Sequence, residues 1–180
     1  EYIYTSDDGG ATWAARLASG LRYWSGVACS ADGSKIVAVT SNGRAYTSSN
    51  SGASFVERVI GAGTTFGTFW TSVACSADGL TIFACRYGGY IYKSTDGGQN
   101  FIACEGAGIR YWRDIACSGD GLRVIALQYG SQYIYTSTDG GSNFVERSEI
   151  GSSNFVDVAC SSDGLTAWLV VDSSINRLIL

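Results

Sequence analysis

Short apolar segments alternate with polar turns along the whole chain, and the same pattern recurs four times. Each copy has an apolar segment ending in Val-Ala-Cys-Ser (Ile-Ala-Cys-Ser once), then an Asp-Gly pair and a segment rich in β-branched residues. The repeated cysteines are Cys29, Cys75, Cys117 and Cys160, spaced 46, 42 and 43 residues apart. Internal repeats of this period are typical of solenoids, propellers and arrays.

The alternation predicts four short strands in each unit, and no segment has helical periodicity. Asp-Gly pairs join the first two strands, because glycine accepts a positive φ and aspartate caps the turn. The expected first strands are 24–30, 70–76, 112–118 and 155–161, and the second strands are 36–40, 82–86, 124–128 and 167–171. The expected third strands are 2–4, 45–46, 90–92 and 133–135, and outer strands follow at 55–58 and 144–147.

A four-stranded antiparallel unit of about 43 residues indicates a blade of a β-propeller. We therefore expect an all-β chain with a single domain, 1–180, built from four such blades. The chain opens and closes in the middle of a unit. The expected units are 1–23 as a half blade, 24–69, 70–111, 112–154, and 155–180 as a second half blade.

The two half blades allow two arrangements. In the first, they form one blade split between the N- and C-termini, which closes a ring within one chain and removes exposed strand edges. In the second, the C-terminal strands pair with the N-terminal strands of the next molecule, giving a ring of chains or an open filament. The apolar residues 175–180 lie where a third strand belongs and compete there with residues 2–4.

A second motif, Ser-x-Asp-x-Gly-x-x-aromatic, recurs in phase with the first. It resembles the Asp-box, or BNR repeat, of sialidases, sortilin-type receptors and the photosystem II assembly factor, and the resemblance covers nearly the whole chain. It implies a β-propeller whose boxes are structural hairpin turns between third and fourth strands. The expected box residues are Ser6, Asp8, Gly10 and Trp13; Ser48, Asn50, Gly52 and Phe55; Ser94, Asp96, Gly98 and Phe101; and Ser137, Asp139, Gly141 and Phe144.

Charge and composition exclude several classes of function. The net charge is −4 and the 12 basic residues are scattered, which argues against binding to nucleic acid. The chain has no histidine, so catalysis by a Ser-His or Cys-His pair and histidine-ligated metal sites are excluded within it. No apolar run approaches the length of a membrane span. We expect no cofactor and no metal.

The six cysteines are expected to be free thiols. Four occupy equivalent places in four repeats and are predicted to fill a tight inner strand as small buried side chains. Cys85 and Cys104 fall on non-adjacent strands of one unit, which disfavours a disulfide between them.

The chain is not expected to be an enzyme. The sialidases that carry similar boxes need an Arg-Ile-Pro signature, and this chain has no proline. Seven of the 16 acidic residues belong to repeat turns. Among the others, Asp114, Asp157 and Glu105 show no recognisable acid/base pairing.

A binding surface is predicted where the chain passes from one blade to the next. Arg-Tyr-Trp occurs there twice and supplies the candidate ligand-binding residues Arg22, Tyr23, Arg110 and Tyr111. Such a face suits a glycan or an acidic peptide, through stacking and charge-assisted hydrogen bonds. The tryptophans that follow, Trp24 and Trp112, are expected to be core residues, as is Trp70.

These observations favour a non-catalytic structural or interaction module whose partner is a protein, including further copies of itself joined through the terminal strands. An extracellular or surface setting is favoured for such an assembly subunit. Two alternatives stay open: a glycan-binding or sialidase-like remnant domain that uses the Arg/Tyr/Trp face, and a protein-binding propeller similar to the photosystem assembly factor.

Overall fold

The structure is a computed structural model that describes residues 1–61, 69–130, 133–148, 153–171 and 174–179. In these residues the regular elements are β-strands and two single-turn 3-10 helices, η1 (Leu17–Ser19) and η2 (Glu105–Ala107). The prediction of an all-β chain is confirmed.

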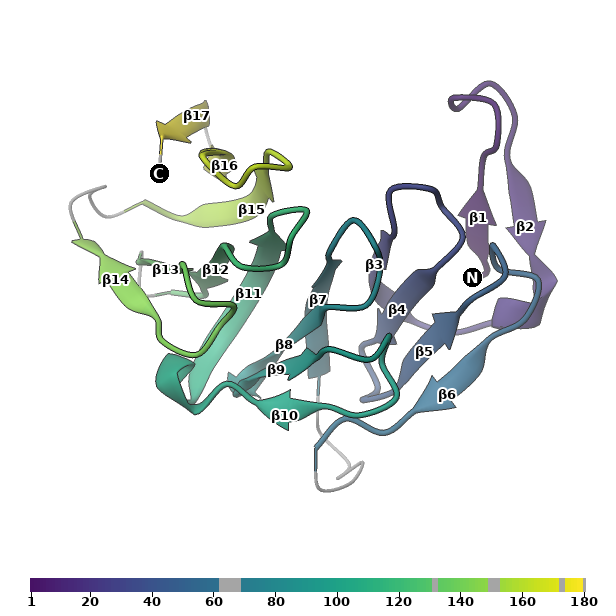
Figure 1. Ribbon diagram of the computed structural model, residues 1–180, viewed down its shortest axis with the longest axis horizontal. Coiled ribbons are helices and arrows are strands. Elements are labelled where there is room, and N and C mark those ends of the chain that lie inside the picture. The colour runs from purple at the N-terminus through teal and green to yellow at the C-terminus, as the bar shows by residue number, and fades with distance from the viewer. Residues whose placement is uncertain (62–68, 131–132, 149–152, 172–173, 180) are drawn as a thin grey trace.

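The strands follow the sequence repeat as a series of antiparallel meanders (Figure 1). An N-terminal hairpin comes first, with β1 (Ile3–Thr5) and β2 (Ala14–Arg16). Unit A contains β3 (Trp24–Cys29), β4 (Ile36–Thr40), β5 (Ala45–Ser48) and β6 (Val56–Arg58). Unit B contains β7 (Phe69–Cys75), β8 (Ile82–Gly89), β9 (Ile91–Ser94) and β10 (Ile102–Ala103). Unit C contains β11 (Arg110–Cys117), β12 (Val124–Gln128), β13 (Ile134–Ser137) and β14 (Val145–Arg147), and unit D contains β15 (Phe155–Cys160), β16 (Thr166–Val171) and β17 (Ser174–Ile179).

Each inner strand, the first of its unit, has a register shift just after its aromatic residue. A bulge of this kind bends the strand and increases its twist. In unit A the position after the shift is Gly26, and a Cβ added there would lie 3.1 Å from the Cα of Ser72 in unit B. The equivalent residues of the later units are Ser72, Asp114 and Asp157. The backbone of unit A therefore lies close to the backbone of unit B at Gly26, and the absence of a side chain there allows this approach.

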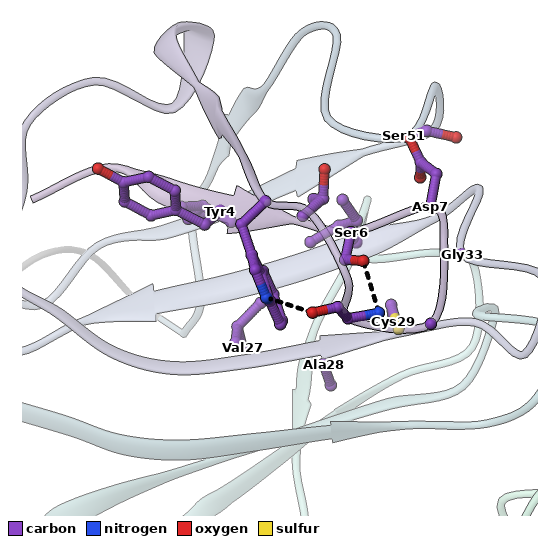
Figure 2. Close-up of a pocket in the computed structure, with 14 residues that line it drawn as sticks. Tyr4, Ser6, Asp7, Val27, Ala28, Cys29, Gly33 and Ser51 are labelled. Atoms are coloured by element: carbon purple, nitrogen blue, oxygen red, sulfur yellow. Dashed lines mark hydrogen bonds between the residues drawn. The ribbon is translucent and has the colours of Figure 1, made fainter.

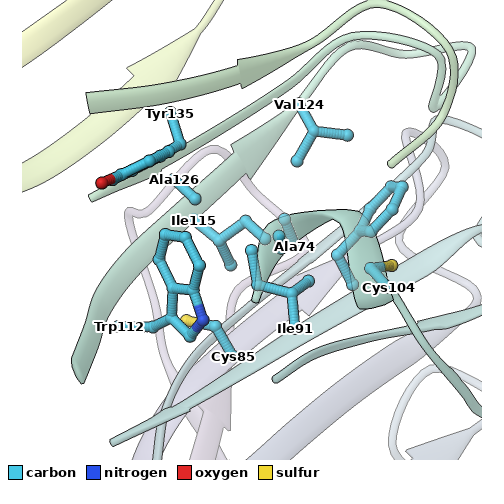
Figure 3. Packing of buried hydrophobic residues seen from close by; sticks show 11 residues of the cluster. Ala74, Cys85, Ile91, Cys104, Trp112, Ile115, Val124, Ala126 and Tyr135 are labelled. Atoms are coloured by element: carbon cyan, nitrogen blue, oxygen red, sulfur yellow. The ribbon is translucent and has the colours of Figure 1, made fainter. Parts of the chain in front are cut away.

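Apolar clusters fill the spaces between neighbouring units, and Figure 3 shows the one between units B and C. At its centre Trp112 is fully buried and packs edge-on against Tyr135, with ring centroids 5.3 Å apart. Trp70 is buried in the same way between units A and B. Trp24, in the first complete unit, stays partly exposed. The tryptophans therefore act as core residues where a unit precedes their own.

A belt of backbone hydrogen bonds ties the inner rims of the units together. The N–H of Ala31 donates to the carbonyl of Ala77 at 2.8 Å, and the N–H of Ala77 donates to that of Gly119 at 2.8 Å. The N–H of Gly119 in turn donates to Ser162 at 2.7 Å. Each bond runs from the turn after one inner strand to the equivalent turn of the next unit. All three bonds run in the same direction. The N–H of each turn donates to the following unit, and the carbonyl of the same position accepts from the preceding unit.

The split blade expected within one chain is not formed. Strand β17 pairs with β16 over its whole length, from Thr166–Ile179 to Val171–Ser174, while β1 pairs with β2. The units fan out as an arc, with the N-terminal hairpin and unit D at opposite ends (Figure 1). Two residues separate β16 from β17, and closing so short a loop costs little chain entropy. The nearby strand therefore takes the edge that residues 2–4 were expected to fill, and β15, β16 and β17 form one three-stranded sheet.

Candidate functional site

The Ser-x-Asp turns are self-contained networks of hydrogen bonds. In the last of them, the carboxylate of Asp139 accepts from the Ser137 hydroxyl at 2.7 Å and from the backbone and side-chain nitrogens of Asn143 at 2.9 and 2.7 Å. These donors lower the pKa of Asp139 to about 2, because they favour the charged form. Asn50 takes the same place in unit A, where its side-chain oxygen accepts from the N–H of Ser54 at 2.9 Å. Donors of the turn itself thus hold these oxygens, which suits a structural role.

The N-terminal hairpin and unit A enclose a cavity of about 500 Å³ (Figure 2). Tyr4 and Trp13 line it from the hairpin, and Val27 and Cys29 line it from β3. Trp13 is the aromatic residue of the first Ser-x-Asp turn, and it is 65% exposed, whereas Phe101 and Phe144 are partly buried at the equivalent places. Trp13 was expected to be a structural residue of its turn, and the exposure of its ring sets it apart from these equivalents. The cavity lies where a complete unit would place its two inner strands.

The exposure of Val27 marks the same opening. Val27 is 58% exposed, although Val73, Ile115 and Val158 at the equivalent positions are 5%, 3% and 6% exposed. The later three are covered by the unit that precedes each of them. The beginning of the arc therefore presents an apolar surface, here called the N-terminal face, that consists of Tyr4, Trp13, Val27 and Cys29.

The other end of the arc presents the complementary surface. Trp168 on β16 is 48% exposed, whereas Val37, Phe83 and Ile125 at the equivalent positions are at most 2% exposed. Ala159 on β15 is also exposed, and Val170 is partly exposed. We call Ala159, Trp168 and Val170 the C-terminal face. In units A to C the matching positions pack against the unit that follows.

The predicted ligand-binding arginines are packed onto tyrosines of their own units. The Arg22 guanidinium lies 4.3 Å from the ring centroid of Tyr46, and that of Arg110 lies 4.4 Å from the ring centroid of Tyr135. Each is a cation–π contact in which the arginine covers a largely buried ring. Tyr23 and Tyr111 point outwards, at 79% and 53% exposure. The two Arg-Tyr pairs lie in units A and C with unit B between them.

Two carboxylates that the sequence left unpaired meet between units C and D. The N–H of Val158 donates to Asp114 at 2.7 Å and to Asp157 at 2.9 Å. Burial, followed by the hydrogen bond with Asp157, raises the pKa of Asp114 to about 6. The sequence gave no signal of this contact, because the residues are 43 positions apart and meet through the repeat.

The six cysteines are free thiols, but the prediction that the four repeated cysteines are buried is wrong: Cys29 is exposed, and Cys75, Cys117 and Cys160 are only partly buried. Burial raises the pKa of Cys75 and Cys85 to about 12, and it also raises the pKa of Cys117. Because the thiolate is the reactive species, these side chains are poor nucleophiles at neutral pH.

In the described part of the chain, no group of three His, Cys, Asp or Glu side chains is placed to hold a metal ion. No helix among the described residues is long and apolar enough to span a membrane.

Neither protein-family models nor curated proteins gave a match to this chain. Solved structures do match it. The GH74 xyloglucanase from Xanthomonas campestris superposes with a TM-score of 0.70 at 17% identity, covering 97% of this chain and 33% of that one. YCF48 bound to D1 peptide gives a TM-score of 0.69 at 19% identity, covering 98% and 56%.

A chain of the nidogen/laminin complex gives a TM-score of 0.73 at 14% identity, with 93% and 64% covered. The chain thus spans less than two thirds of each of these structures. The matched structures are β-propellers, and identities this low carry information about fold alone. Together with the repeated antiparallel meanders, they show that this chain has the fold of β-propeller blades.

Proposed function

We propose that the chain is a non-catalytic interaction module of the Asp-box type whose units continue head to tail into a second copy of the same chain. The observation that carries this proposal is the exposure of Val27, 58% against 3–6% at its three equivalents. An inner-strand side chain of this kind is buried wherever a unit precedes it. The cavity beside Val27 has the place and the apolar lining that a preceding unit would fill.

The chain itself carries the matching part. The C-terminal face repeats the positions that units A to C use to cover the next unit. The backbone hydrogen bonds between units support the same direction of contact. The N–H of Ser162 is equivalent to the N–H donors of Ala31, Ala77 and Gly119, so it would donate to the unit that follows unit D. In the second copy its acceptor would be the carbonyl of Ala31. This contact is heterologous, so it forms a ring or a filament according to the angle between copies.

Strand β17 occupies the edge of β16 that β1 of the next copy would use. In this association β1 of the next copy replaces β17 beside β16. Strand β16 therefore keeps the same number of neighbouring strands, as in recognition by strand addition. Truncation after residue 173 is expected to strengthen self-association, because it removes the competing strand. Sedimentation velocity over a range of concentrations measures this, and weaker association of the truncated chain would contradict the exchange.

Replacement of Val27 by aspartate is expected to abolish self-association, because a charge in the apolar contact has no partner there. Light scattering coupled to size-exclusion chromatography reports the mass. Val145→Asp is the matched control, since Val145 is 54% exposed on an outer strand away from both faces. A monomeric wild-type chain at all concentrations, or an unchanged Val27→Asp variant, would rule the proposal out.

A mixing experiment tests the direction of the contact. Val27→Asp leaves the C-terminal face intact, and Ala159→Asp leaves the N-terminal face intact. Each variant alone is expected to be monomeric, and an equimolar mixture is expected to form a dimer through the two intact faces. A mixture that stays monomeric would contradict a head-to-tail contact even if both variants are folded.

Three observations support a role without catalysis. The turn aspartates are saturated by donors of their own turns, the buried thiols are protonated, and the pair of carboxylates holds a backbone amide. Two of the matched structures are complexes, YCF48 with a D1 peptide and nidogen with laminin. These neighbours support partner binding as a use of the fold, and we extend it to this chain as part of the proposal.

A further inference from the structure

We propose that a cluster of exposed aromatic side chains across units B and C binds a proline-rich, acidic segment of another protein. The cluster consists of Phe69, Tyr87, Tyr111 and Tyr129, with Arg113 at its rim, and is called the aromatic platform. It is separate from both terminal faces and goes beyond the self-association proposed above.

The strand register builds the platform. Phe69 lies opposite Tyr87 between β7 and β8, and Tyr87 lies opposite Tyr111 between β8 and β11. The N–H of Tyr129 donates to the carbonyl of Tyr111 at 2.6 Å, which adds the fourth side chain. The Tyr87 ring centroid lies 4.7 Å from that of Tyr111 and 6.1 Å from that of Tyr129. The three tyrosine rings therefore form one cluster around Tyr87, and Phe69 lies on the strand next to Tyr87, about 4.8 Å away.

The platform is open to solvent. The four rings are between 45% and 53% exposed, and contiguous exposed apolar groups of this kind mark interaction sites. In the described part of the chain, the three platform hydroxyls make no hydrogen bond. Tyr46 and Tyr135 differ, because their hydroxyls bind Glu57 at 3.2 Å and Glu146 at 2.7 Å. The platform therefore offers both ring surface and free hydroxyl donors to a ligand.

The charge at the rim is positive. The Arg113 guanidinium lies 5.2 Å from the ring centroid of Tyr129 and donates to the side-chain oxygen of Asn154 at 3.3 Å. Among the described residues, no carboxylate forms an ion pair with Arg113. The positive charge of Arg113 is therefore available to an acidic ligand, although the chain as a whole has a net charge of −4. The rim therefore favours an acidic group beside the segment that covers the rings.

A polyproline II segment fits this arrangement. It rises about 3.1 Å per residue and has no internal hydrogen bonds, so one turn of three residues spans roughly 9 Å, close to the extent of the tyrosine cluster, with its carbonyls free to accept from tyrosine hydroxyls. Aromatic-lined surfaces recognise such segments because the ligand is already ordered before binding. Residues 1–180 contain no proline, so none of them can supply this segment.

The test uses a fluorescein-labelled peptide of three Glu-Pro-Pro repeats and measures anisotropy. We expect saturable binding by the wild-type chain and at least about tenfold weaker binding by Tyr111→Ala, as for an aromatic hot spot. Arg113→Gln should weaken binding and reduce its dependence on salt. Ile102→Ala is the control, because Ile102 is an apolar side chain on the outer strand β10 of unit B and is 68% exposed. It should bind like the wild type, and all variants should keep the wild-type melting temperature.

Three outcomes would overturn the proposal. The first is a lack of binding, and the second is equal binding of the flexible Glu-Gly-Gly repeat peptide. The third is retardation of the chain by hydroxyethyl cellulose in affinity gel electrophoresis, lost in Tyr111→Ala, without binding of the proline-rich peptide. That result would assign the platform to a neutral glycan instead.

Discussion

Replacement of Trp112 by alanine is expected to lower the free energy of unfolding by about 3–5 kcal/mol, the usual cost of removing a large buried aromatic side chain. Trp112 is fully buried between units B and C and contacts the rings of Tyr135 and Phe144, with centroids 5.3 and 6.4 Å away. The deletion leaves a cavity that antiparallel sheets on both sides cannot easily close. The loss is a large part of the about 5–15 kcal/mol that stabilises a typical domain.

Urea denaturation followed by far-UV circular dichroism measures this change. Trp112→Phe is the matched variant, because the Trp112 indole nitrogen is buried without a hydrogen-bond partner and its removal leaves no new unsatisfied group. We expect Trp112→Phe to lose less than half as much stability as Trp112→Ala. Equal losses would contradict ring volume as the source of this stabilisation.

The stability of the chain is expected to fall as the pH rises from about 4 to above 6, because Asp114 is buried and is hydrogen-bonded to Asp157. The pKa of Asp114 is raised from 3.8 to about 6, so the folded state binds the proton more tightly than the unfolded state does. The stabilisation is fully present below pH 3.8 and is lost as the pH passes 6. A shift of this size is worth about 2–3 kcal/mol at pH 8.

The turn aspartates act in the opposite direction. Hydrogen bonds lower the pKa values of Asp8 and Asp139 to about 2, so their stabilisation is present above pH 3.8 and is lost as the pH falls towards 2. Maximum stability is therefore expected near pH 4–5, between these two limbs.

Asp114→Asn separates the two effects. The amide oxygen can still accept from the N–H of Val158, and the neutral side chain removes the cost of burying a charge at this position. Urea titrations at pH 4.5 and pH 8 should show a gain in stability at pH 8 and little change at pH 4.5. The same fall with pH in wild type and variant would contradict the assignment. Asp120→Asn is the control, because hydrogen bonds lower the pKa of Asp120 in an exposed turn.

Local features of the fold follow from the sequence alone. The second strands of units A and C, 36–40 and 124–128, are where alternation predicts them. The Asp-Gly turns have positive φ at Gly33, Gly79, Gly121 and Gly164, and the Ser-x-Asp turns form local hydrogen bonds. Such features depend on residues a few positions apart, so a repeated motif predicts them four times over.

The sequence did not predict the contacts between units. The repeat indicated which faces are apolar, but the exposure of Val27 against its buried equivalents depends on which unit lies beside it. Arg22 and Arg110 were predicted as ligand-binding residues, and in three dimensions they stack on tyrosines of the third strand.

The sequence by itself determined the all-β class, the four-part repeat, the strand order within a unit and the turns, because each follows from alternation and short-range hydrogen bonding. The tertiary structure alone decided which strand fills the free edge of β16, which aromatic rings gather into the platform and which carboxylates meet. The physical reason is that equivalent residues of different units look alike in sequence. Their burial, charge and pairing differ only through the neighbours that the arc gives each of them.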